Sequence, residues 1–413
     1  MIEQQKKYGW VIVIIAVLSL MISNGLAIGG LPPFYKPIRE EFVAIGAIDA
    51  SWAETFIGNS ANITFLISGI SSLIGGWFIS RSGLRPVMLL GCVLLGGGLL
   101  IHSQASSAEV VYAARGLMGA SLGFIGVAPC VVLVSKWFDK GRGTALGIVL
   151  TGTSLGGAAI PLVAAPLIAR YGWRYTMVAL TSTVWLILFP AIAFLVREPS
   201  LKTSEPADIA ANDGMTIGEA VRTPLFWAFG ACAALVFYPI FVTSQQFILY
   251  LQSPKIGVSA ETAAFAQSAL FAISIGGKFL AGTLSDKFRA IRVMVGCSLL
   301  MFAASLVLLG LTADNSLYFL LPFAIGYGGT FVLLQRLAAD FFGRREIGKI
   351  LGLITLIEVT GAAIGGRITG YLADRNGGDY TYAFFGVTIA SALAFLATLA
   401  IFALHKKRLE NAL

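Results

Sequence analysis

Two charged side chains interrupt long apolar runs of this sequence, and both could do chemistry there. Lys278 lies in LFAISIGGKFLAGTLSDKF and Glu358 lies in GLITLIEVTGAAIGG. A charge near the centre of a membrane helix costs about 2.5 to 3.5 kcal/mol on insertion scales, so such residues are candidate functional sites. A buried lysine is a point charge that can lose its proton, and a buried carboxylate must be paired, protonated or hydrated. Both residues are therefore candidates for carrying a proton or for an ion pair.

The surroundings of Lys278 separate two interpretations of its charge. Counted at about 1.5 Å per residue, Lys278 lies roughly 10 Å from the nearer end of its helix, so its long side chain could reach the membrane surface. Gly276 and Gly277 precede the lysine and Gly282 follows it. Small residues let another backbone or a ligand approach closely, which favours a packed or cavity-facing position over a lipid-facing one.

Other polar residues inside apolar runs are weaker candidates. Arg115, Arg336 and Arg367 lie within about two turns of the ends of their runs, which favours conformational or packing roles over ligand contact. Uncharged polar residues in the central thirds could either contact a substrate or bond a neighbouring helix, at roughly 1 kcal/mol or less per bond. These residues are Asn24, Asn62, Thr151, Tyr238, Gln245 and Tyr327.

The elements that must hold these residues are membrane-spanning helices. Of the 413 residues, 57% are hydrophobic and 12% are charged, whereas soluble domains carry about 25% charged residues. This composition indicates a multi-pass protein in a lipid bilayer. The net charge of +8 lies in short loops between apolar runs, which is typical of membrane orientation and argues against nucleic acid as a partner.

The apolar runs predict an all-α membrane protein with twelve transmembrane helices. We expect these helices near residues 9–31, 52–79, 84–102, 108–135, 142–169, 173–196, 224–251, 259–285, 290–312, 315–341, 347–373 and 381–404. The segment between the sixth and seventh helices is polar and rich in Pro, Ser, Asp and Ala, as linkers are. We therefore expect an N-terminal six-helix bundle over 1–197, a cytoplasmic linker over 198–223 and a C-terminal six-helix bundle over 224–413.

The distribution of Lys and Arg between the two sides predicts the orientation. The side that holds both termini carries most of these residues, spread over every loop assigned to it. Positive charge marks the cytoplasmic side, so both termini are expected there. The predicted location is the cell membrane, which would be the inner membrane in a bacterium.

Patterns that would indicate an enzyme or an ATP-driven pump do not occur in the sequence. His102 and His405 lie at the ends of apolar runs, and no GxxxxGK[ST] phosphate loop is found. The four cysteines are dispersed without CxxC spacing, so neither a zinc site nor a disulfide framework is indicated. We expect no catalytic residues, no metal and no cofactor, and any energy must come from an ion or substrate gradient.

Two pairs of loops repeat between the predicted halves. Gly76–Gly91 (GWFISRSGLRPVMLLG) resembles Gly282–Gly296 (GTLSDKFRAIRVMVG), and Lys136–Ile148 resembles Asp340–Ile354. Parallel repeats of this kind build transporters whose substrate site lies between two halves near the membrane midplane. The two Gly-x-x-x-(Ser/Asp)-(Arg/Lys) loops resemble the signature loop of the major facilitator superfamily.

This resemblance implies conformational or gating roles for charged residues near the helix ends. In the family, close helix packing and a basic cluster in the signature loop brace the closed bundles. The first loop has Ser80 where an aspartate is usual, and the second keeps the aspartate. The residues to which we assign such roles are Arg81, Arg85, Arg115, Arg142 and Asp286.

Three longer stretches are similar to the monocarboxylate transporter branch of this superfamily and to its oxalate/formate antiporter relatives. Tyr8-Gly9-Trp10 opens the first span as in those families. Lys136–Gly156 (KWFDKGRGTALGIVLTGTSLG) resembles their fifth-span signature. Gly352–Val387 resembles the eleventh span and following loop of monocarboxylate transporters in residue type and spacing.

The same resemblance places Lys278 where the family carries an eighth-span arginine that holds the substrate carboxylate. Ser274 occupies the position of an aspartate four residues earlier, and Gly29 aligns with or close to a first-span lysine used in proton coupling. A lysine cannot offer the planar fork of an arginine. Transport of an organic anion is therefore better supported than the family's own proton-coupling arrangement.

The family fold also brings the eighth and eleventh helices together beside the cavity. The depths of Lys278 and Glu358 differ by about 6 Å when counted from helical rise, so they are candidates for an ion pair or for proton coupling. The seventh and tenth spans line the cavity in the family, which adds Tyr238 and Tyr327 to the candidates. The predicted substrate-binding residues are Lys278, Tyr238, Tyr327, Asn62 and Ser274.

The leading hypothesis is a secondary transporter of a small, lactate- or pyruvate-like monocarboxylate, coupled to a proton by alternating access. One alternative is a carboxylate antiporter of the oxalate/formate type. Another is a carrier of a neutral or zwitterionic solute such as an amino acid, with Lys278 permanently paired to Glu358. The expected partners are a small organic anion and the bilayer, and the functional unit is expected to be a monomer.

Overall fold

Helices make up the described part of the chain. The computed structural model describes residues 2–138, 142–197, 214–312, 315–343 and 347–410, in which the secondary-structure elements are helices and one isolated β-bridge joins Gly214 to Gly343. The contacts divide the chain into two compact units. Unit 1 comprises Met1–Lys202, Ser244–Ala272 and Gly370–Asp379, and unit 2 comprises Thr203–Thr243, Ile273–Thr369 and Tyr380–Leu413.

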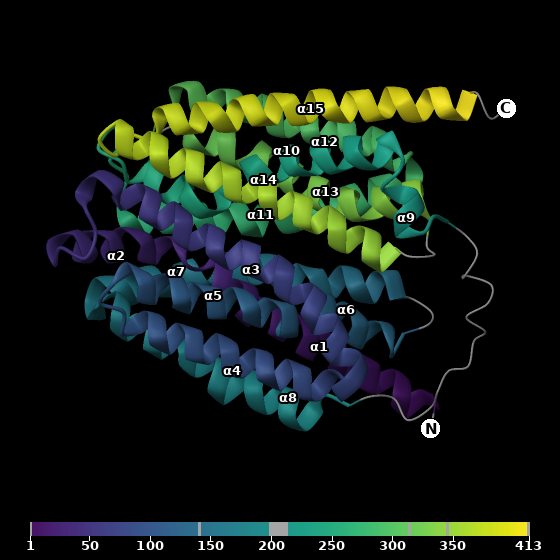
Figure 1. Ribbon diagram of the computed structural model, residues 1–413, viewed down its shortest axis with the longest axis horizontal. Coiled ribbons are helices and arrows are strands. Elements are labelled where there is room, and N and C mark those ends of the chain that lie inside the picture. The colour runs from purple at the N-terminus through teal and green to yellow at the C-terminus, as the bar shows by residue number, and fades with distance from the viewer. Residues whose placement is uncertain (1, 139–141, 198–213, 313–314, 344–346, 411–413) are drawn as a thin grey trace. The chain divides into compact units, whose positions relative to one another are not determined.

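Unit 1 is built on the helices of the first 195 residues. They are α1 (Ile2–Asn24), η1 (Gly25–Gly29), α2 (Pro32–Ala44), η2 (Ala50–Trp52), α3 (Ala53–Ser82), α4 (Leu84–Ser103), α5 (Ala108–Ile125), α6 (Val127–Ser135), α7 (Arg142–Thr183), η3 (Val184–Leu188) and α8 (Phe189–Leu195). Helix α5 packs against both α3 and α4 (Figure 1). Glycines permit this packing, since a Cβ on Gly119 would lie 2.4 Å from the Thr64 carbonyl oxygen of α3.

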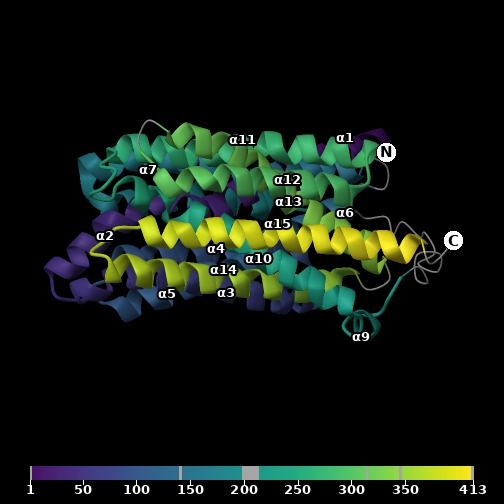
Figure 2. The same cartoon turned by 90° about the horizontal axis from the view of Figure 1, so that it is seen from above.

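Unit 2 holds most of the remaining helices. The helices from residue 217 onward are α9 (Ile217–Ala220), α10 (Pro224–Leu251), α11 (Ala260–Lys287), α12 (Ala290–Ser305), η4 (Leu306–Gly310), α13 (Ser316–Phe342), α14 (Ile347–Arg375) and α15 (Thr381–Glu410). One end each of α10, α11 and α14 belongs to unit 1. Helix α12 packs against α13 and α15, and the three run side by side in Figure 2.

The predicted domain boundaries do not coincide with the boundaries of the two contact units. The boundaries at 197 and 223 follow chain order, whereas the contacts assign Ser244–Ala272 and Gly370–Asp379 to the unit of the N-terminal helices. Most of the predicted linker, residues 198–213, lies outside the described residues. The division into two six-helix bundles stays a prediction.

Eleven helical segments within the described ranges are long and apolar enough to cross a membrane. The segment Gly147–Leu195 has 49 residues and would extend about 74 Å at 1.5 Å per residue, more than twice the roughly 30 Å hydrocarbon core. Gly172 breaks it with φ 79° and ψ 163°, a conformation that favours glycine. The break falls between the expected spans 142–169 and 173–196, so the eleven segments agree with twelve crossings.

The first helical segment is longer than predicted. Its expected end was residue 31, but helix α2 extends it to Ala44 after the π-helical turn η1. Pro32 begins α2, where a missing amide hydrogen costs nothing. The extension carries Lys36, Arg39, Glu40 and Glu41. Because these residues are charged, a span predicted from hydropathy ends before them.

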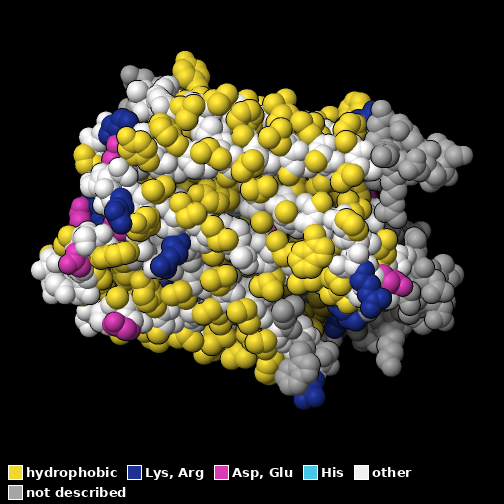
Figure 3. All heavy atoms as spheres, turned by 45° about the horizontal axis from the view of Figure 1, so that its top comes forward, with side chains coloured by type: hydrophobic (Ala, Val, Ile, Leu, Met, Phe, Trp, Pro, Cys, Tyr) yellow, Lys and Arg dark blue, Asp and Glu magenta, His cyan; other side chains and the backbone are white. Residues whose placement is uncertain are grey.

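The exposed surface matches a lipid environment. Figure 3 shows hydrophobic side chains over most of the face in view, with most charged side chains near the helix ends. Leu186, Phe194 and Tyr318 are 75, 72 and 73% exposed. Isolated apolar residues are common on soluble proteins, but a continuous apolar surface of this extent indicates a membrane or partner contact.

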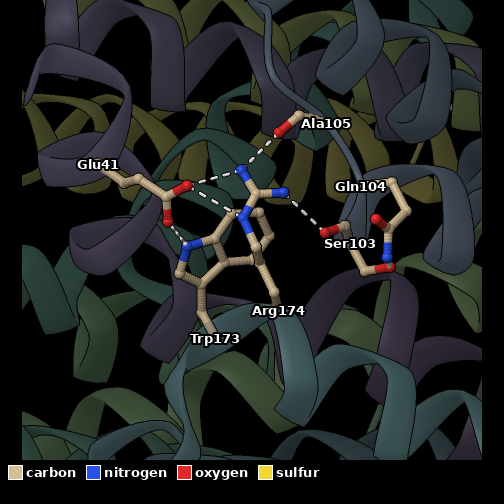
Figure 4. Close-up of polar contacts among 6 residues, drawn as sticks. All are labelled: Glu41, Ser103, Gln104, Ala105, Trp173 and Arg174. Atoms are coloured by element: carbon tan, nitrogen blue, oxygen red, sulfur yellow. Dashed lines mark hydrogen bonds and ion pairs between the residues drawn. The ribbon is translucent and has the colours of Figure 1, made fainter. Parts of the chain in front are cut away.

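A polar cluster ties α2 to α7 beside the break at Gly172 (Figure 4). Arg174 donates to Glu41 Oε1 from Nε at 3.0 Å and from Nη2 at 2.7 Å, and Trp173 Nε1 donates to Glu41 Oε2 at 2.6 Å. The guanidinium also donates to the carbonyl oxygens of Ser103, the last residue of α4, at 2.8 Å and of Ala105 at 2.7 Å. One arginine therefore holds three chain segments together and caps the end of a helix.

Arg174→Lys should lower the thermal stability of the purified protein more than Glu41→Gln does. Lysine cannot reproduce the fork that reaches the carboxylate and two carbonyl groups, and each bond lost from a partly buried cluster costs about 1 kcal/mol. Thermal unfolding in detergent measures the difference. Arg170→Lys, at an exposed position four residues earlier, is the matched control, and equal effects at the two arginines would contradict the assignment.

Candidate functional site

The backbone around Lys278 is in close contact with α13. A Cβ on Gly277 would lie 2.3 Å from the Ile325 carbonyl oxygen, and one on Gly328 would lie 2.1 Å from the Ser274 carbonyl oxygen and 2.9 Å from the Lys278 amide nitrogen. Only glycine permits such an approach, because any side chain would force the helices apart. The expected close packing around the lysine is present at Gly277, whereas Gly276 and Gly282 face open space.

The Lys278 side chain is buried. It is 7% exposed, and its Nζ atom lies 5.0 Å from the centroid of the Phe331 ring on α13. An ammonium over an aromatic face is attracted to the ring quadrupole without losing its net charge. The side chain therefore packs inside unit 2 and does not extend to the membrane surface.

Phe331 is a site residue that the sequence analysis did not single out. Its ring lies 6.1 Å from that of Phe237 on α10, so an aromatic pair connects α10 to the lysine. A phenylalanine in an apolar helix carries no chemical signal of its own. The only feature of the sequence that points to Phe331 is its position one helical turn after the candidate Tyr327.

Glu358 is buried on α14 in the same unit. It is 2% exposed, and its Oε1 atom has no hydrogen-bond partner among the residues that the structure describes. An ion pair or proton coupling between Glu358 and Lys278 stays a prediction. A carboxyl oxygen in this setting carries the full cost of lost hydration, which is typical of a functional group.

The two candidate tyrosines occupy different surroundings in unit 2. The Tyr238 ring lies 3.0 Å from where a Cβ on Gly365 of α14 would be, and its hydroxyl lies 3.1 Å from the corresponding position on Gly386 of α15. These glycines form a notch that receives the tyrosine. Tyr327 is 8% exposed on α13, next to the glycine that contacts Ser274. Ser274 itself is fully buried.

Asn62 lies in the other unit. It is 7% exposed on α3 of unit 1, whereas Lys278, Ser274, Tyr327 and Glu358 are all residues of unit 2. Its role in substrate binding stays a prediction.

The two signature loops are stabilised differently. Arg81 and Arg85 are exposed on either side of Gly83, whose φ of 81° makes the turn between α3 and α4. In the second loop, Arg336 of α13 donates from Nη1 to Asp286 Oδ1 at 2.5 Å and to Ser285 Oγ at 2.8 Å. The retained aspartate thus joins the end of α11 to α13. The Arg142 side chain lies outside the described residues.

Arg115 is the largest fully buried side chain of the described residues and is only 1% exposed. Its Nε atom donates to the Ser60 carbonyl oxygen at 3.0 Å, and Nη2 donates to the Tyr35 hydroxyl at 3.2 Å. The Tyr35 hydroxyl donates in turn to Gln245 Oε1 at 2.7 Å. Gln245 was a weak candidate in the sequence, and Tyr35 was missed because it lies beyond the predicted end of the first span. All four residues belong to unit 1.

Comparison with protein families gives one match over nearly the whole chain. The model described as Major Facilitator Superfamily matches residues 13–255 and 240–412. Monocarboxylate transporter 13 of Bos taurus is 26% identical over 394 residues, which cover 91% of this chain and 85% of that protein. The oxalate:formate antiporter of Oxalobacter formigenes is 24% identical over 404 residues, which cover 95% of this chain and 91% of that protein.

Solved structures agree with the fold. A D-xylose-proton symporter superposes with a TM-score of 0.75 at 16% identity, covering 95% of this chain and 97% of that one. A bacterial homologue of the human lysosomal transporter Spinster, in an inward-facing and occupied conformation, gives a TM-score of 0.74 at 16% identity, with 96% of each chain covered. At this identity the likeness concerns the fold alone.

Gly328→Ala should destabilise the protein, whereas Gly276→Ala should not. The added methyl group at residue 328 would overlap the Ser274 carbonyl oxygen, and overpacking of this kind typically costs about 1 to 3 kcal/mol. Gly276 lies two residues before Lys278 with open space around it, and alanine favours the helix there. Thermal unfolding of both variants measures the difference. Equal stability of the two would show that α11 and α13 are not in close contact.

Proposed function

The chain belongs to the Major Facilitator Superfamily, and on this basis we propose that it carries a small organic monocarboxylate across the membrane together with a proton. Membership makes it a multi-pass membrane transporter and not an enzyme. The similarity to a monocarboxylate transporter and to an oxalate:formate antiporter, each over more than nine tenths of this chain, supports a carboxylate as the substrate. Lactate and pyruvate are the representative candidates.

The observation that carries the proposal is the buried ammonium of Lys278. It lies on α11, packed against α13, with its charge over the Phe331 ring. The ring stabilises the ammonium without neutralising it, so the attraction to an anion is retained. In a medium of low dielectric constant this attraction is several times stronger than in water. A single ammonium matches the single charge of a monocarboxylate.

Glu358 is the proposed proton carrier. Its buried Oε1 atom has no hydrogen-bond partner among the described residues, so the carboxyl is free to hold a proton without breaking a hydrogen bond at that atom. Because Lys278 and Glu358 have opposite charges, they offset one another in the empty carrier. A carboxylate on Lys278 and a proton on Glu358 neutralise both groups in the loaded carrier.

Coupling between the solute and the proton follows from the free-energy cost of a carrier that holds only one of them. With only one of the two cargoes bound, one charge within the membrane is left uncompensated, at about 2.5 to 3.5 kcal/mol on insertion scales. That energy disfavours the partly loaded state roughly 60-fold to 300-fold, since each 1.4 kcal/mol is a factor of ten. The empty and fully loaded carriers therefore cross between their two states most readily.

Exchange of one carboxylate for another is the second candidate, favoured by the similarity to an oxalate:formate antiporter. In that mode uptake requires a counter-substrate inside and does not respond to a pH gradient. Glu358 in the middle of the eleventh predicted span would oppose a dianion, so exchange of monocarboxylates fits the residues better than exchange of oxalate.

Lys278→Gln should abolish uptake of labelled lactate or pyruvate into proteoliposomes under an inward proton gradient. The loss of a charge-assisted contact should weaken substrate binding roughly 10-fold to 100-fold. Lys278→Arg keeps the charge and should retain measurable binding. Absence of monocarboxylate uptake by the wild-type protein would overturn the proposal. Unchanged binding by a folded Lys278→Gln variant would instead indicate a carrier of neutral or zwitterionic solutes.

Glu358→Gln should lose accumulation driven by a proton gradient but keep exchange of internal for external substrate. Glutamine fills the same space and cannot take up the coupling proton, so the fixed neutral group mimics the protonated state. Parallel assays of gradient-driven uptake and counterflow test this prediction. Glu109→Gln, at an exposed position at the start of α5, is the control. Gradient-driven accumulation by Glu358→Gln would exclude Glu358 as the proton carrier.

A further inference from the structure

Unit 1 contains a buried cation whose hydrogen-bond partners are neutral groups. Arg115 is 1% exposed, and its hydrogen-bond partners are the Ser60 carbonyl oxygen and the Tyr35 hydroxyl. Its guanidinium also lies 5.8 Å from the centroid of the Tyr35 ring. In the described part of the chain it forms no ion pair with a carboxylate. Buried charges are ordinarily paired, so this arrangement requires an explanation.

One edge of the guanidinium has no partner at all. The Nη1 atom of Arg115 is buried and makes no hydrogen bond to any described residue. An arginine keeps its proton in proteins, so its charge cannot be removed to relieve the cost. Two carboxylates of the same unit form ion pairs with other arginines: Glu54 with Arg39, and Glu41 with Arg174. The guanidinium therefore offers donors for an anion that is not part of the protein.

Tyr35 completes the set of donors. Its hydroxyl accepts from Arg115 Nη2 and donates its hydrogen to Gln245 Oε1 at 2.7 Å. The Gln245 amide nitrogen is bonded weakly, at 3.4 Å to the carbonyl oxygens of Ile28 and Ser244. The amide oxygen of Gln245, whose side chain is fully buried, thus occupies the place at Tyr35 that an anionic oxygen would take.

We infer that Arg115 and Tyr35 form a second carboxylate-binding site, which opens when the end of α10 that carries Gln245 withdraws from Tyr35. This inference rests on the proposed function, because the carboxylate is that of the transported solute. One carboxylate oxygen accepts from Arg115 Nη1, and the Tyr35 hydroxyl turns its hydrogen from Gln245 to the other. The solute contacts this site in a different state of the carrier from the one described here.

The charge of the site selects a monoanion. One guanidinium balances one carboxylate, and a dianion would bring an uncompensated charge into a buried site. Because Nε bonds Ser60 and Nη2 bonds Tyr35, the guanidinium offers Nη1 to one carboxylate oxygen and the Tyr35 hydroxyl serves the other. Arg115 and Tyr35 together therefore contact both oxygens of the carboxylate.

Equilibrium binding of labelled pyruvate to the purified full-length protein tests the inference. In a Lys278→Gln background, binding that remains should fall about tenfold or more on adding Arg115→Gln, because a charge-assisted contact is lost. Arg115→Lys should lose less. Arg170→Gln, at an exposed arginine of the same unit, should leave binding unchanged.

Gln245→Ala keeps the inference testable if Arg115→Gln does not fold. Removal of the competing amide oxygen should strengthen pyruvate binding about threefold to tenfold, whereas a purely structural bond between Tyr35 and Gln245 predicts no change or a loss. Unchanged or weaker binding by Gln245→Ala overturns the inference. So does a folded Lys278→Gln, Arg115→Gln protein that binds pyruvate as well as Lys278→Gln alone. If the wild-type protein binds no monocarboxylate, the proposed function fails first, which distinguishes the two outcomes.

Discussion

Hydrocarbon solvates neither a charge nor an unpaired backbone amide, and the rest of this structure depends on that constraint. The backbone meets it with helices, in which every interior amide bonds within its own segment. The side chains meet it by placing most charges near the helix ends, where Arg174 and Arg336 each bond a carboxylate and further oxygen atoms. The few charges that remain inside the helices are therefore the candidate functional groups.

Three such charges are accommodated in three ways. The ammonium of Lys278 lies over an aromatic ring, which attracts it without removing its net charge. Arg115 is surrounded by neutral oxygen atoms, with one nitrogen left without a partner. Glu358 has a carboxyl oxygen without a partner. Each arrangement is costly in a resting protein. In the proposed mechanism each becomes favourable when an anion or a proton arrives, and a carrier that holds only one of the two is disfavoured.

Glycine determines how closely these groups are held to the rest of each unit. Gly277 and Gly328 bring α11 and α13 into backbone contact at Lys278, so the lysine cannot shift along α13 without separating the helices. The Gln245 side chain is fully buried, accepts one short hydrogen bond from Tyr35 and makes two long ones through its amide nitrogen. In the inferred mechanism its withdrawal leaves Arg115 and Tyr35 accessible to the solute.

Much of this followed from the sequence because hydropathy and spacing are local properties. Apolar runs of membrane length predicted the spans, including the two that the structure joins through Gly172. The signature loops and the three longer stretches similar to monocarboxylate transporters predicted the family. The positions of Lys278 and Glu358 inside apolar runs marked them as candidates before any fold was known. The ends of helices were less certain, since α2 continues the first span with charged residues that hydropathy excludes.

Tertiary structure alone decided what the polar side chains contact. The ammonium of Lys278 lies over Phe331, 53 positions later in the chain, and Arg115 reaches Tyr35 and, through it, Gln245, which is 210 positions from Tyr35. No local pattern encodes such pairs, because they depend on which helices pack together and on how far each is rotated about its axis. The sequence by itself determined which residues are expensive to bury, and the packing decided which of them are left with a donor or acceptor to offer a ligand.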